Sequence, residues 1–568
     1  MYIATVPNRG SRPAILLREG YREGGQVKNR TLANLSAWPP AKVELLRRVL
    51  RDERLAPVDQ LFDVVASPHH GHVQAVRTAM RRLGFEALLA ARPSRERALV
   101  VAMVVARILA PESKLATTRW WHTTTLPADL GVAGADEDAC YAALDWLLAR
   151  QARIEQKLAA RHLRAGGLVL YDLTSSYFEG TTCPLAAFGH DRDGKKGKLQ
   201  VNYGLLSDAR GCPVAVSVVP GNTGDPTTLL PEVTRVRTAF GIEQLVLVGD
   251  RGMISQTQIT ALQQLPGVDW ITALKTGAIR DLVAGGHLQL GLFDERNLFE
   301  LTAPEFPGER LVACRNPELA TLRARKRQAL LAATTQELER VRGMVARGRL
   351  TGQDAIGVRV GKVVNKYKVA KHFRLDIRAD GFDFAIDDRQ VAAEAALDGL
   401  YVLRTSVPAA RLGTADAVRS YKQLSQVERA FRTLKTIDLE VRPIHHRLAD
   451  RVRAHIFLCL LAYYVEWHMR AAWRPLLFAD EDQAAKTTRD PVAPAARSAA
   501  ALRKVHTKVL DDGTPVHSFR TLLTELSGIV RNVCRRQGAA ADEPTFTLLT
   551  TPNATQHRAY ALLETITV

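Results

Sequence analysis

The apolar residues of this chain follow a helical spacing first and a strand-like spacing afterwards. Through residues 43–49, 73–89 and 98–109 they recur at the intervals that one face of a helix requires. Residues 1–40 differ, because two short apolar runs flank a turn rich in glycine and proline. We therefore expect a small strand-rich piece at 1–40 and a mainly helical domain at 41–165.

From residue 166 the apolar runs become short and continuous, as in buried strands. Between them, Asp225 and Pro226 read as an N-cap followed by the first helical residue, and Ser255 with Gln258 has the form of a capping box. The expected strands are 168–174, 199–206, 213–219, 245–249 and 269–274. This β-β-β-α-β-α-β order predicts an α/β fold, a mixed sheet with helices on its faces.

Residues 276–397 interrupt the sheet. Nine basic and three acidic residues lie between positions 315 and 349, so the interruption is basic. Short strands are expected at 287–292, 299–301 and 310–313, and a helix at 317–346. We expect this segment to be a basic, β-rich insertion subdomain.

The core pattern then returns with a strand at 400–405 and an apolar helix at 456–469. We assign the core to residues 166–275 and 398–475. Residues 476–568 are expected to form a C-terminal helical region, a candidate for dimerisation.

Composition narrows the class of partner. The 568 residues allow two to four domains, and 78 Lys and Arg against 59 Asp and Glu give a net charge of +19. Such a charge favours a polyanion, with nucleic acid first and an anionic membrane surface as the alternative. The six cysteines form no CxxC pair, which disfavours a zinc ribbon and fits a reduced cytosol. The longest apolar stretches are too short to span a bilayer, so we expect a cytoplasmic, nucleoid-associated protein.

Three acidic residues are the candidates for a catalytic metal site. Asp172 and Asp250 each close an apolar run, where a carboxylate is costly unless its charge is compensated. Glu428 lies on a helix-patterned stretch that begins near Tyr421. Taken singly, each aspartate is a turn residue and Glu428 an ordinary partner of Arg432. Taken together, they are the donor set that a pair of Mg²⁺ ions needs for phosphodiester chemistry.

The stretch around Glu428 has two faces. Its apolar stripe is Leu424, Val427, Phe431 and Leu434. Its polar face is Tyr421, Glu428, Arg432 and Lys435, about 90° from the stripe at ~100° per residue. Glu428 is therefore expected at the edge of the core, with Lys435 two turns on and placed to contact a phosphate. Between positions 191 and 198 we expect a flexible basic loop.

The motifs around the three acids resemble a known family. Tyr171-Asp172-Leu173-Thr174, Gly249-Asp250-Arg251-Gly252-Met253 and Tyr421-x2-Leu424-x3-Glu428-x6-Lys435 are similar to the DDE transposases of bacterial insertion sequences. The similar branch has a Tyr-Arg-Glu-Lys signature and a β-rich insertion, and residues 441–447 also resemble it. The resemblance covers about residues 166–470.

The resemblance implies a ribonuclease-H-like catalytic core. It implies that Asp172, Asp250 and Glu428 are the catalytic and metal-binding residues, holding two Mg²⁺ ions for which Mn²⁺ can substitute. Leu424 departs from the signature, which has arginine there, and Arg432 is a candidate replacement. The expected DNA-binding residues are Tyr421, Arg432, Lys435, Arg442 and His446.

The activity implied is that of a DNA transposase. Such an enzyme cuts insertion-sequence ends and joins the 3′-OH to target DNA. Its partners would be terminal inverted repeats and target DNA, bound by a homodimer in the synaptic complex, with residues 41–165 as a candidate for end recognition. Two alternatives remain open: a Mg²⁺-dependent DNA nuclease without strand transfer, and a catalytically inactive DNA-binding protein derived from a transposase.

Overall fold

A computed structural model of the protein describes residues 1–53, 61–294, 296–484, 488–493 and 496–568. The chain forms two compact units. The first unit comprises Met1–Pro68 with Val530–Thr550, and the second comprises His69–Ile529 with Thr551–Val568. Residues 41–68 therefore belong with the strand-rich N-terminal piece and not with the helices that follow.

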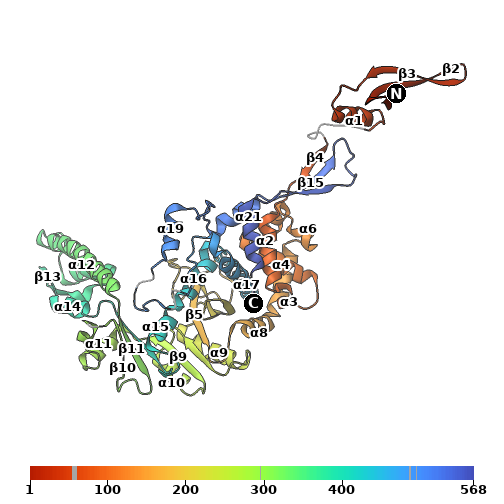
Figure 1. The fold of residues 1–568 in the computed structure, drawn as a ribbon. Helices are drawn as coiled ribbons and strands as arrows, with labels where there is room; N and C mark the ends of the chain where they lie inside the picture. Colours follow the sequence, from red (N-terminus) through yellow and green to blue (C-terminus); the bar gives the residue numbers. More distant parts are fainter. Residues whose placement is uncertain (54–60, 295, 485–487, 494–495) are drawn as a thin grey trace. The chain divides into compact units, whose positions relative to one another are not determined.

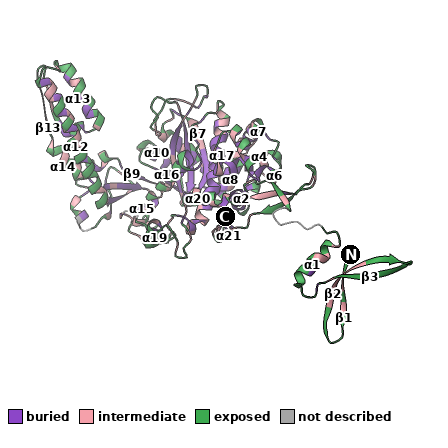
Figure 2. Ribbon diagram, turned by 90° about the horizontal axis from the view of Figure 1, so that it is seen from above, coloured by how far each residue is buried: buried purple, intermediate pink, exposed green. Residues whose placement is uncertain are grey.

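The first unit contains two antiparallel sheets. Strands β1 (Tyr2–Asn8), β2 (Ser11–Glu23) and β3 (Gln26–Asn34) form one, followed by α1 (Pro40–Val49). The second sheet has the order β16-β15-β4, from Phe546–Leu549, Arg531–Arg536 and Phe62–Ala66. Most of β1–β3 is exposed (Figure 2).

The strands β15 and β16 correct the expectation that residues 476–568 form a helical region. Residues Val533 and Cys534 of β15 pair with Ala66 and Val64 of β4, which lies near the other end of the chain. Local periodicity does not report such a distant pairing. The helices of this region are α19 (Ala499–Thr507), α20 (Phe519–Ser527) and α21 (Ala554–Glu564), with a short 3₁₀ turn η6 (Arg474–Leu476) before them.

Helices begin the second unit, as the apolar spacing predicts. They are α2 (Gly71–Arg82), α3 (Phe85–Leu89), α4 (Arg95–Leu109), α5 (Lys114–Trp120), η2 (Trp121–Thr123), α6 (Leu126–Leu130), α7 (Glu137–Leu148) and α8 (Gln151–His162). Ser94, Ser113 and Asp136 cap α4, α5 and α7 through their side chains. No helix among the described residues is long and apolar enough to span a membrane.

An eight-stranded mixed sheet forms the centre of the second unit, which confirms the expected α/β class. Its order is β10-β11-β14-β9-β8-β5-β6-β7. The strands on one side are β5 (Leu168–Tyr177), β6 (Gln200–Asp208) and β7 (Pro213–Pro220), and each is antiparallel to its neighbour. The others are β8 (Leu245–Val248), β9 (Val268–Ala273), β14 (Leu400–Thr405), β11 (Arg310–Arg315) and β10 (Leu298–Leu301). Strands β5, β8 and β9 are mutually parallel; α9 (Asp225–Thr238) lies between β7 and β8 in the chain, and α10 (Gln256–Leu262) connects β8 to β9.

The segment 276–397 is mainly helical, so the expectation of a β-rich insertion was wrong. Its helices are α11 (Thr276–Ala284), α12 (Pro317–Ala346), α13 (Gln353–Tyr367) and α14 (Asp388–Ala395). Only β12 (Phe373–Ile377) and β13 (Phe382–Ile386) form a separate hairpin, after the short turn η4 (Ala370–His372), while β10 and β11 extend the central sheet. The expected strand at 287–292 overlaps a 3₁₀ turn, η3 (Leu290–Asp294).

Helical spacing of apolar residues explains the correction. In α13, Ile356, Val360 and Val364 repeat every four residues and are buried in one cluster with Leu338 and Val341 of α12. Val363, three residues after Val360, is buried in the same cluster, and residues an odd number of positions apart lie on opposite faces of a strand. The helix expected at 317–346 is present with those bounds.

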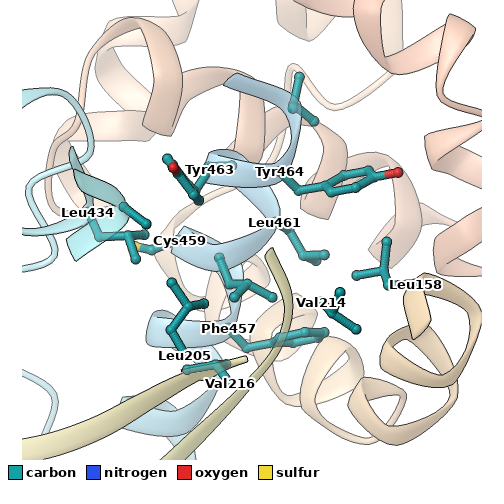
Figure 3. Close-up of a cluster of buried hydrophobic side chains, with 14 of the residues drawn as sticks. Leu158, Leu205, Val214, Val216, Leu434, Phe457, Cys459, Leu461, Tyr463 and Tyr464 are labelled. Carbon is teal, nitrogen blue, oxygen red and sulfur yellow. The ribbon is translucent and has the colours of Figure 1, made fainter. Parts of the chain in front are cut away.

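Helix α17 (Ala449–Ala472) is a largely buried helix of the second unit. It lies between α4 and α7 on one side and β7 on the other, and it is buried along most of its length (Figures 1 and 2). Figure 3 shows Phe457 and Leu461 of this helix beside Val214 of β7 and Leu158 of α8. The same hydrophobic cluster continues to Leu434, so α17 links the N-terminal helices to the part of the chain that carries Glu428.

Candidate active site

Parallel pairing sets the first two acids side by side. Strand β5 pairs with β8 so that Leu170 lies opposite Val248, and Asp172 and Asp250 each follow two residues later. Carboxyl ends of parallel strands meet at one edge of a sheet, where loops and ligands gather. The register therefore brings together two aspartates that are distant in the sequence.

The two aspartates have different surroundings. Asp172 is half-buried, and burial, reinforced by the charge of Asp250, raises its pKa to about 7. Asp250 lies in the turn after β8, and its Oδ1 accepts hydrogen bonds from the backbone N–H groups of Gly252 at 2.9 Å and Met253 at 2.7 Å. These bonds hold the carboxylate at the sheet edge.

Glu428 comes from a helix that packs beside β5. Helix α16 (Leu424–Arg432) buries Val427 and Phe431, and the Phe431 ring meets the Tyr203 ring of β6 edge-on, with centroids 6.0 Å apart. Glu428 itself is exposed and lines the cavity that Asp172 and Asp250 also line. Burial of the apolar stripe therefore directs this third carboxylate to the same place.

The helix around Glu428 is not continuous, contrary to our expectation. Tyr421 belongs to α15 (Thr414–Lys422), and a separate turn of π-helix, η5 (Thr433–Ile437), follows α16. The extra residue of a π-turn rotates the chain, and Lys435 is buried rather than exposed. Nevertheless Glu428, Arg432 and Lys435 line one cavity.

The cavity has a volume of about 390 Å³ and a strongly charged wall. Its charged lining residues are Asp172, Arg192, Asp193, Asp225, Asp250, Glu428, Arg432, Lys435 and Arg442. Tyr421 is not among the residues that line the cavity; burial first, and then the negative charges of Asp250, Glu428 and Asp172, raise its pKa to about 12. Within the described residues, the three acids supply an all-oxygen donor set, which hard divalent cations such as Mg²⁺ prefer.

Asp193 is a residue that the sequence did not single out. It lies where we expected a flexible basic loop, yet its side chain is only 1% exposed. Its Oδ1 accepts a hydrogen bond from Lys435 Nζ at 2.9 Å and pairs with Arg442 Nη1. Burial acts to raise the pKa of Asp193, but the bonds from Arg442 and Lys435 outweigh it and lower the pKa. The excess of basic residues around it was the only signal in the sequence.

Arg192 and Asp225 form a second ion pair in the wall. Arg192 Nη2 bonds both carboxylate oxygens of Asp225, at 2.6 Å to Oδ2. Asp225 is therefore not the N-cap of α9, as its sequence context suggested; Gly224 is, and Asp225 occupies the first helical position. Similarly, Ser255 bonds the Gln258 side chain and makes no side-chain bond to the backbone of α10.

The structure does not bring every expected residue to the cavity. His446 packs edge-on against Tyr141, with ring centroids 6.0 Å apart, and near His455, and burial lowers its pKa to about 3. Leu424 is partly buried against the main hydrophobic core, so the signature arginine has an apolar residue in its place.

Among the described residues, the group whose potential ligand atoms all lie within 4.8 Å of one another is His162, Cys212 and His468, and the three acids are not such a group. Both ring nitrogens of His162 already have partners, Tyr464 Oη at 3.0 Å and Arg210 Nη2 at 3.3 Å. The guanidinium of Arg210 would also repel a cation, so we interpret this group as a buried hydrogen-bond network.

Comparisons with known proteins identify the type of chain. A model of the transposase DDE domain matches residues 167–465, and one of the IS1634 family transposase N-terminal domain matches residues 3–57. A search of curated proteins gave no significant match.

Two solved structures show distant similarity. One is a piggyBac transposase in a synaptic complex with hairpin DNA, with 9% identity and a TM-score of 0.33, covering 80% of this chain and 77% of that one. The other is a Mos1 transposase paired-end complex with the left transposon end, with 11% identity and a TM-score of 0.15, covering 34% of this chain and 62% of that one.

Proposed function

This chain belongs to the DDE transposase family, and from that premise we propose that Asp172, Asp250 and Glu428 are its catalytic acids. The general activity of the family is metal-dependent cleavage and transfer of DNA strands. The observation that carries the residue assignment is that all three carboxylates, from three separate segments, line one cavity. We further propose that the mixed sheet is a ribonuclease-H-like core.

The donor set favours divalent metal. We propose that Asp172, Asp250 and Glu428 hold two Mg²⁺ ions, for which Mn²⁺ can substitute, and which when bound would activate a water and stabilise the leaving oxygen. Burial first, and then the negative charge of Asp250, raise the pKa of Asp172 to about 7, so both disfavour its charged form. A bound cation would offset both effects and would favour the deprotonated carboxylate.

The basic side chains around the acids would hold the DNA backbone. Arg432 is exposed at the cavity, while Lys435 and Arg442 are held in its wall. We propose that these residues and Tyr421 contact phosphates near the cut site, which positions the strand without reading its sequence. The substrates would be terminal inverted repeats and target DNA, the helices between Gly71 and His162 would recognise the ends, and a homodimer would hold two ends.

A strand-transfer assay tests this assignment. Purified protein is mixed with a labelled terminal-repeat duplex and a supercoiled target plasmid, in Mg²⁺, in Mn²⁺ and in EDTA. We expect cleaved ends and joined products only with metal. Cleavage without joining would indicate the nuclease alternative.

Substitutions in the triad test the residues. Asp172→Asn, Asp250→Asn and Glu428→Gln should each lower cleavage by ~100-fold or more while leaving duplex binding within about twofold of the parent. Asp416→Asn is the matched control, because Asp416 is an exposed carboxylate on α15 whose ion-pair partner among the described residues is Arg419. A triad variant that still nicks the duplex at the parent rate would refute the assignment.

A further inference from the structure

The segment between β5 and β6 carries two adjacent charged residues into the cavity wall. Arg192 and Asp193 both line the cavity that the three acids share. The segment is fixed locally, because Asp191 Oδ1 accepts a hydrogen bond from Asp193 N at 2.9 Å and Asp193 Oδ2 accepts one from Tyr177 N at 3.0 Å. Neither residue belongs to the Tyr-Leu-Glu-Lys pattern around Glu428.

Asp193 joins two cations from another part of the chain. Its Oδ1 meets both Lys435 Nζ and Arg442 Nη1, so the ammonium and the guanidinium stand next to each other. An ammonium has three N–H donors and a guanidinium five, so each retains donors after bonding to Asp193. Their side chains are 10% and 20% exposed, so those donors remain accessible only at the cavity.

Of the two terminal nitrogens of Arg192, one donates hydrogen bonds to a carboxylate and the other has no hydrogen-bond partner among the described residues. Its Nη2 is fixed by Asp225, whereas its Nη1 is buried and has no hydrogen-bond partner among the residues that the structure describes. A buried N–H donor without a partner is unfavourable. Because Nη1 has almost no accessible surface while the Arg192 side chain is 17% exposed, a phosphate oxygen in the cavity would bond Nη1 after a small movement of this side chain and would satisfy the donor.

We propose that Arg192 binds a DNA phosphate in this site and that Asp193 is the positioning residue that sets Lys435 and Arg442 beside it. This rests on the proposed function and deepens it. A guanidinium presents a rigid fork to phosphate oxygens, which an ammonium does not. The segment before β6 thus supplies the guanidinium that Leu424 cannot supply from the helix.

Binding experiments test Arg192 without requiring catalysis. Affinity of the full chain for a terminal-repeat duplex is measured by fluorescence anisotropy in EDTA over a range of NaCl concentrations. Each lost phosphate contact lowers the slope of log affinity against log salt by about 0.9. We expect Arg192→Gln to lower the slope by about that amount, and Arg429→Gln, an exposed arginine of α16 outside the cavity lining, to leave it unchanged.

A second variant covers misfolding of the first. If Arg192→Gln unfolds because Asp225 is left unpaired, the double variant Arg192→Gln/Asp225→Asn removes the charges of both partners. A folded variant of either kind with the slope of the parent overturns the assignment of Arg192. Because these measurements need neither metal nor cleavage, they stay informative even if the parent protein does not transfer strands.

Substitutions of Asp193 are expected to affect DNA binding and DNA cleavage differently. Asp193→Asn removes the negative charge between two cations, so DNA binding should be as tight as in the parent or tighter. Cleavage of the bound duplex should nevertheless slow by about tenfold or more, because Lys435 and Arg442 lose their fixed positions. Asp193→Glu should restore part of the rate. A merely structural role would weaken binding and cleavage together, and an unchanged cleavage rate in Asp193→Asn would overturn the proposal.

Discussion

Replacing Lys114 by methionine is expected to stabilise the second unit and to reduce its dependence on pH. Lys114 is the first residue of α5 and is only 4% exposed. Burial, together with the positive charge of Arg107, lowers its pKa to about 7, against 10.5 for an ordinary lysine. The side chain is thus held in an environment that disfavours its charged form.

The sign and size follow from proton linkage. Between pH 7 and 10.5 the unfolded chain binds a proton at Lys114 that the folded chain does not, so stability rises with pH across this window. At about 1.4 kcal/mol per pKa unit, the penalty is on the order of 4 kcal/mol at pH 7 and about 2 kcal/mol at pH 9. Methionine has a similar length and no charge, so Lys114→Met should remove most of this penalty.

Urea unfolding at pH 7 and pH 9 measures the effect. Tryptophan fluorescence is a suitable signal, since the fully buried Trp121 directly follows α5. We expect the parent to gain about 2 kcal/mol of stability relative to Lys114→Met between the two pH values. Lys326→Met, at an exposed position of α12, is the control and should follow the parent. If Lys114→Met shows the same change with pH as the parent, the burial argument fails.

Three further substitutions probe packing around the site and in the insertion. Gly204→Ala would place a methyl group 2.2 Å from the hydroxyl oxygen of the buried Tyr171, next to Asp172, and should lower the melting temperature and strand cleavage together. Gly357→Ala, where an added methyl group meets nothing within 4 Å, should leave both intact or raise the melting temperature slightly, and equal effects of the two changes would contradict this reasoning. Arg327 of α12 donates to Asp398 at 3.0 Å in a buried ion pair, so Asp398→Asn should destabilise by about 3–5 kcal/mol in urea unfolding. A loss below about 1 kcal/mol would show that this pair is effectively solvated.

Local patterns were sufficient for most elements of the core. Apolar runs predicted the strands β5, β6, β7, β8 and β9 and the helix α12. This was possible because the pattern of apolar residues within a buried strand or an amphipathic helix is visible over a few neighbouring positions. In the segment 276–397 the strands expected at 299–301 and 310–313 are present as β10 and β11, but the strand expected at 287–292 is absent and the helices α11, α13 and α14 were not predicted. The C-terminal strands β15 and β16 were missed because their partner β4 is distant in the sequence.

The residues of the candidate site also fall into those that the sequence predicted and those that it did not. Its three acids were recognisable because each stands at a marked position, two after apolar runs and one on an amphipathic helix. Asp193 carried no such mark. Its pairing with Lys435 joins residues 242 positions apart, and no local rule connects them. The π-turn that carries the buried Lys435 was likewise not predicted from the sequence.

For this protein the amino-acid sequence determined which segments are apolar, which acids end them, and which family the motifs belong to. Only the tertiary structure decided that Arg192 and Asp193 share the cavity of those acids, that Asp225 serves an ion pair, and that the insertion is helical. The physical reason is that periodicity is a short-range property of the chain, whereas ion pairing and strand register are set by distances that exist only once the chain has folded.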